Sequence, residues 1–171
     1  MRPVLWSAAA VAGCAMLPPR TEILSRSPSF KAQTVVVAAF GADPAADPEV
    51  SRALAAAARS AGLRALPLEA ISAALPGAVV SPDVLCDPRT LTELRRSSGV
   101  DAVVLVALDP SGTSARLTAL DARTGDAVLR ATLRPRGESF TGAAQIAQAA
   151  AAAIAELSSA PPARLEDLPV P

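Results

Sequence analysis

The sequence of 171 residues contains no histidine and no tyrosine, and its aromatic content is 2%. Without histidine the chain lacks the usual general base near neutral pH and the commonest protein ligand of metal ions. With so few aromatic residues, the core has to be built from Val, Leu, Ile and Ala side chains. We therefore predict no metal site and no cofactor.

An excess of charge of one sign is also missing, because 16 basic and 16 acidic residues give a formal net charge of zero. The basic residues are scattered along the chain, and Arg95-Arg96 is the only adjacent pair. Such a balance offers no electrostatic footprint for nucleic acid. We expect no nucleic-acid partner, and we interpret Arg95-Arg96 as part of a solvated helix face.

Motifs of the common enzyme classes are absent as well, since no G-x-S-x-G, P-loop or G-x-G-x-x-G sequence occurs. A serine nucleophile would have only Lys31 as a base, and Lys31 lies in a segment that we interpret as a tether. Aspartates fall near the ends of the expected elements, where capping and turn formation account for them. Four of them precede proline: Asp43, Asp47, Asp87 and Asp109. We predict that the protein is not an enzyme.

The N-terminus begins with Met1-Arg2 and an apolar run over 3–12, which is too short to span a bilayer. The next residues, Val11-Ala12-Gly13-Cys14, resemble the lipobox of bacterial lipoproteins. The resemblance implies that a signal peptidase recognises Val11, Ala12 and Gly13 and cleaves before Cys14. It also implies that Cys14 is acylated and anchors the mature chain in a lipid bilayer.

Ala15, rather than aspartate, follows Cys14, which resembles the default signal for export to the outer membrane. We expect a lipid-anchored protein on the outer membrane that faces the periplasm, with the inner membrane and the cell surface as alternatives. A disulfide between Cys14 and Cys86 is conceivable on count alone, but acylation of Cys14 leaves Cys86 as a lone thiol. We favour Cys86 as a small, partly buried apolar residue over Cys86 as a reactive thiol.

Composition divides the chain into a signal peptide (1–13), a lipidated cysteine and tether (14–33), a folded domain (34–157) and a proline-rich disordered tail (158–171). Continuous apolar runs predict buried strands over 34–40 and 100–108. Alternating residues predict a half-exposed hairpin over 115–120 and 127–133. Further elements are expected as a short strand over 63–66 and helices opening at Asp47-Pro48, Leu68, Asp87-Pro88 and Thr141.

The expected order is β-α-(β)-α-α-β-β-β-α, which places the chain in the α/β (α+β) class. We predict a mixed sheet of about four to five strands, with helices packed mainly on one face and the hairpin near an edge. Three stretches resemble envelope domains related to the TolB amino-terminal domain, CsgG and LpoB: 34–40, 98–104 and 117–129. The resemblance implies a βα sandwich that works in envelope assembly through protein–protein contact.

Two hypotheses about function follow. In the first, the protein is a non-enzymatic accessory or assembly factor of a cell-envelope complex, and a protein partner extends the exposed edge of the 115–133 hairpin. In the second, it is a ligand-binding or weakly catalytic periplasmic domain that uses a cleft at the sheet edge. Self-association into a homo-oligomer is a third hypothesis.

The lipobox predicts the outcome of one substitution. A Cys14→Ala precursor should no longer incorporate radiolabelled fatty acid in cells, because the thiol that receives the lipid is gone. The unsubstituted precursor serves as the control, and continued labelling of the Cys14→Ala form would contradict the assignment.

Overall fold

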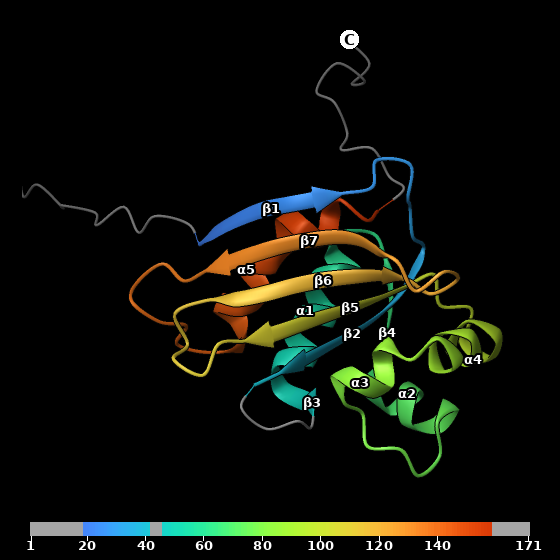
Figure 1. Ribbon diagram of the computed structural model, residues 1–171. Coiled ribbons are helices and arrows are strands. Elements are labelled where there is room, and N and C mark those ends of the chain that lie inside the picture. The colour runs from blue at the N-terminus through green and yellow to red at the C-terminus, as the bar shows by residue number, and fades with distance from the viewer. Residues whose placement is uncertain (1–18, 42–45, 159–171) are drawn as a thin grey trace, which may run out of the picture.

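The structure, a computed structural model, describes residues 19–41 and 46–158 and has a mixed sheet of seven strands at its centre (Figure 1). Neighbouring strands follow the order β1-β7-β6-β5-β2-β3, and β4 pairs with β2 beside this path. The α/β class is confirmed, although the sheet has more strands than the four to five expected. The strands are β1 (Arg20–Arg26), β2 (Thr34–Phe40), β3 (Ala46–Asp47), β4 (Arg64–Leu66), β5 (Ala102–Leu108), β6 (Ala115–Asp121) and β7 (Ala127–Arg134).

Strand β2 is the most deeply buried element, since all seven of its residues are buried. It runs parallel to β5, with Val35 opposite Ala102 and Phe40 opposite Ala107. Side chains of a strand alternate between the two faces of a sheet, so a strand that is apolar throughout needs cover on both sides. The continuous run Thr34–Phe40 therefore requires a layer of packing on each face of the sheet.

Helices supply that cover on both faces, whereas the sequence predicted them mainly on one. The two long helices, α1 (Pro48–Ser60) and α5 (Ala143–Ala155), pack side by side against the face that carries Val35 and Val37. Three short helices cover Val36 and Val103 on the opposite face. They are α2 (Leu68–Ala74), α3 (Pro82–Cys86) and α4 (Pro88–Ser98).

The helix starts predicted at Asp47-Pro48 and Asp87-Pro88 are confirmed by capping hydrogen bonds. The helix expected to open at Thr141 begins two residues later, at Ala143. The Asp47 carboxylate accepts from the backbone N–H groups of Glu49 and Val50, both at 3.0 Å. The Asp87 carboxylate accepts from the N–H of Arg89 at 2.7 Å. Each cap is followed by proline in the first turn, where a missing N–H costs no hydrogen bond.

The tether predicted over 14–33 contains a strand, because residues 20–26 form β1 and pair antiparallel with β7. Every β1 side chain except Thr21 is exposed, so the segment lacks the apolar alternation that marks a strand in sequence. Its backbone ladder holds it to the sheet, together with a hydrogen bond from the Thr21 hydroxyl to the Ala149 carbonyl of α5. At the last residue of β1, Arg26 forms an ion pair with Glu156.

Helices α2–α4 should contribute strongly to stability if they seal the second face. Replacing Leu94 of α4, which is 1% exposed, with alanine should lower the free energy of unfolding by roughly 2–5 kcal/mol, because it leaves a cavity. Val79→Ala, at an apolar residue that is 69% exposed, is the matched control and should change it by less than about 0.5 kcal/mol. Equal, small effects of both substitutions in urea denaturation would show that the second layer is not packed as described.

Candidate interaction surfaces

The residues predicted to direct lipidation, Val11, Ala12, Gly13 and Cys14, lie outside the described residues, so acylation stays a prediction. The number of residues between Cys14 and β1 sets an upper limit on the distance from Cys14 to the domain. Strand β1 starts at Arg20, six residues later, and six residues of extended chain span at most about 20 Å. In the ranges 19–41 and 46–158, none of the helices has the length and apolar character needed to cross a membrane.

Two aspartates of the described chain, Asp109 and Asp121, stabilise turns, as the sequence predicts. Asp109 accepts hydrogen bonds from the hydroxyl (2.7 Å) and N–H (2.8 Å) of Ser111, which lower the pKa of its carboxyl. Asp121 accepts from the N–H of Arg123 at 2.7 Å in the hairpin loop. Among the residues that the structure describes, no three His, Cys, Asp or Glu side chains are grouped to hold a metal ion.

Asp101 has a larger role than its place before β5 suggested. Its carboxylate accepts from the N–H groups of Gln33 and Thr34, both at 2.9 Å, and so ties the start of β2 to the start of β5. These two hydrogen bonds join residues far apart in the chain, and the parallel pairing of the two strands brings these residues together. Asp101 is thus part of the framework of the fold.

Cys86 lies at the end of α3 and is more exposed than expected, although burial still desolvates its thiol in part. Helix α3 spans only five residues, and its buried position is taken by Leu85. Partial desolvation of the thiol, and then the nearby carboxylate of Asp83, raise the pKa of Cys86. A raised pKa keeps the group a thiol at neutral pH, which disfavours nucleophilic reactivity.

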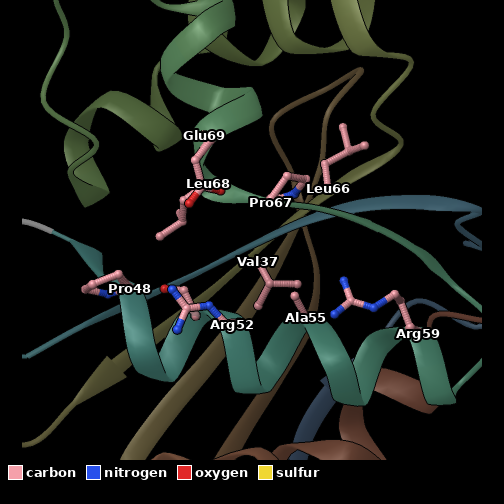
Figure 2. Close-up of a pocket in the computed structure, with 10 residues that line it drawn as sticks. Val37, Pro48, Arg52, Ala55, Arg59, Leu66, Pro67, Leu68 and Glu69 are labelled. Carbon is pink, nitrogen blue, oxygen red and sulfur yellow. The ribbon is translucent and has the colours of Figure 1, made fainter.

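The cleft hypothesis can be compared with a hollow beside β2, between α1 and α2 (Figure 2). Val37 lies between helix α1 and the segment that begins at Leu66 (Figure 2). The hollow has a volume of about 110 Å³, well below the roughly 300–1,000 Å³ of small-molecule sites. Next to it, the buried Ser51 hydroxyl accepts from the N–H of Ala39 at 2.9 Å, so this polar group already has a partner.

The free edge of the sheet is not where the sequence placed it. The 115–133 hairpin was expected to offer an edge, yet β6 lies between β5 and β7, and β7 lies between β6 and β1. The outer side of β1 is one edge of the sheet instead, and the short strands β3 and β4 lie at the other. It carries Ile23 and Leu24, which are 41% and 60% exposed, and a bulge between Ile23 and Ser25 leaves Leu24 outside the pairing with β7.

Comparison with known proteins supports the fold. No protein-family model matches the sequence, and no curated protein is significantly similar to it. Among solved structures, the PelC dodecamer from Paraburkholderia phytofirmans matches with a TM-score of 0.52 and 16% identity, over 84% of this chain and 99% of that one. At this identity the likeness shows a shared fold and no more.

Two further matches have TM-scores below 0.5 and carry no argument. One is the lipoprotein GNA1162 from Neisseria meningitidis, with a TM-score of 0.49 and 19% identity over 64% of this chain and 86% of that one. The other is the LpoB C-terminal domain from Salmonella enterica, with a TM-score of 0.48 and 14% identity over 62% and 84%.

The raised pKa of Cys86 predicts how its reactivity depends on pH. In the chain from residue 14 with Cys14→Ala, Cys86 is the sole thiol. Its rate of reaction with a disulfide reagent should rise with pH, and the pH at the midpoint of this rise should lie above that of a short cysteine peptide. Asp83→Asn should lower the midpoint only in part, since the carboxylate is the second cause of the shift. A midpoint at or below that of the peptide would contradict the assignment.

Proposed function

We propose that the protein is a lipid-anchored component of the bacterial cell envelope that acts through protein–protein contacts. In this proposal acylated Cys14 holds it on the outer membrane, facing the periplasm, and the domain serves as a non-enzymatic accessory or assembly factor of an envelope complex. The observation that carries the proposal is the free edge of β1, which begins six residues after Cys14.

An edge strand presents unpaired N–H and C=O groups to which another chain can add a strand. The backbone of β1 supplies such groups on its outer side, and the bulge turns Leu24 out of the ladder. An apolar side chain at this position can enter a pocket of the partner while the backbone provides hydrogen bonds. Among the described residues, the large hydrophobics that are exposed are Ile23, Leu24 and Val79, and two of these three belong to β1.

The structural use of the aspartates supports an absence of catalysis. Asp47, Asp87 and Asp101 accept hydrogen bonds from backbone N–H groups of the domain itself. Carboxylates engaged in this way stabilise helix ends and strand starts.

Self-association is the second candidate. It is favoured by the likeness to PelC, a protein of the same fold that forms a dodecamer and that the alignment covers over 99% of its length. A second copy of this chain could add its own β1 to the β1 edge, because two identical strands that pair antiparallel are related by a twofold axis.

Photo-crosslinking in intact cells tests the contact. A photoreactive residue at Ser25, in the exposed part of β1, should form an adduct with a partner protein or with a second copy. Leu24→Lys should reduce the adduct severalfold, because a lysine in the contact would have to be desolvated. Val79→Lys is the matched control, since it places the same charge at another exposed apolar residue.

The mass of the adduct separates a partner from a second copy. If the Ser25 probe gave no adduct with any protein, or if both lysine variants lowered the yield equally, the β1 edge would not be the contact surface.

A further inference from the structure

The face of the sheet that α1 and α5 do not cover is strongly basic over β6, β7 and β1. Helices α2–α4 cover β2, β5 and one end of β6 and β7, at Leu120 and Ala127, on this side. No helix lies over β1 or over the remaining length of β6 and β7 (Figure 1). Four exposed arginines project from this uncovered part of the sheet, and we call the surface that they form the basic face. They are Arg20, Arg116, Arg130 and Arg134. They are scattered in sequence and come together through strand register alone.

The register places these side chains close to one another. Arg116 is opposite Thr132, so Arg130 and Arg134 lie diagonally on either side of it, at distances of about 7–8 Å between backbones. Arg20 is directly opposite Arg134 across β1 and β7. Like charges directly opposite each other destabilise a sheet, so the fold tolerates a repulsion here.

Few acidic groups offset this charge. Within the described chain, none of the four arginines forms an ion pair; the ion pairs there use Arg26, Arg96 and Arg123 instead. Glu22, which is opposite Thr132, is the carboxylate on the face itself, and Asp109 is close enough to Arg116 to interact electrostatically.

At one end the basic face opens into a shallow hollow of about 400 Å³ that is lined by Arg20, Arg134, Arg136 and a single acid, Glu138. This end is where the domain begins. Arg20 is the first residue of β1 and lies six residues after Cys14, so the chain can hold it no more than about 20 Å from an acylated Cys14. Helices α2–α4 lie toward the other end of the sheet, so they do not block an approach from this side (Figure 1).

We propose that the basic face docks on the anionic phospholipid headgroups of the membrane that holds Cys14. A guanidinium binds a phosphate through two parallel hydrogen bonds, and a basic surface strengthens and orients an acylated anchor. This inference rests on the proposed lipid anchor, because the short link to Cys14 is what selects a membrane over other polyanions. Docking here fixes the orientation of the domain and leaves the β1 edge open to a neighbour in the plane of the membrane.

Vesicle binding without the acyl chains tests the docking. The chain from residue 14 to 171 with Cys14→Ala keeps every described residue and should bind vesicles of equimolar phosphatidylglycerol and phosphatidylcholine more tightly than vesicles of pure phosphatidylcholine. The triple variant R20Q/R116Q/R134Q should bind the anionic vesicles about 100-fold more weakly, from roughly fivefold per arginine. Its thermal midpoint should stay the same or rise, because the repulsion between Arg20 and Arg134 is removed.

The triple variant R52Q/R59Q/R89Q removes the same charge from exposed sites on α1 and α4 and should bind within a few-fold of the parent chain. Equal affinity of the parent for both kinds of vesicle, or equal losses in the two triple variants, would overturn the proposal. The assay contains neither an acyl chain nor a protein partner, so its outcome does not depend on lipidation of Cys14 or on contacts of β1. Those are tested separately by fatty-acid labelling and by crosslinking.

Discussion

The pairing of β1 with β7 is the interaction on which the arrangement of the molecule depends. It makes most of the predicted tether part of the domain, and it leaves five residues between Cys14 and the first strand. It also encloses the 115–133 hairpin within the sheet and makes β1 the new edge. The same register sets Arg20 against Arg134 and completes the basic face. The proposed contact edge and the proposed membrane surface therefore arise from one strand pair.

A second constraint comes from β2, which is buried on both sides. It needs α1 and α5 on one face and α2–α4 on the other, and the hydrogen bonds of Asp101 hold its start in place. The side chains at the centre of the domain are therefore used for packing between the sheet and its two helix layers. Surfaces that can meet other molecules are left at its margins: the β1 edge and the arginines over β6 and β7.

Local signals made a large part of this fold predictable from sequence. The apolar run Thr34–Phe40, the caps at Asp47 and Asp87, and the alternation of the hairpin each depend on neighbours in the chain. Strand β1 was missed because its side chains are exposed and its partner lies more than a hundred residues away. Helices α2 and α3 bury only Ile71 and Leu85, too few positions to reveal which face they cover. The basic face depends on register, which no local pattern of Arg20, Arg116 and Arg134 discloses.

The most direct test of this account is an NMR measurement of cross-strand nuclear Overhauser effects between β1 and β7 in the chain from residue 14. The structure predicts contacts between the backbones of Thr21 and Leu133 and between those of Ile23 and Ala131. It also predicts that they persist when Leu24 is replaced by lysine, because that side chain lies outside the ladder. If residues 20–26 showed no such contacts and had the chemical shifts of an unstructured chain, the segment would be a tether after all, and the edge and the basic face would not exist as described.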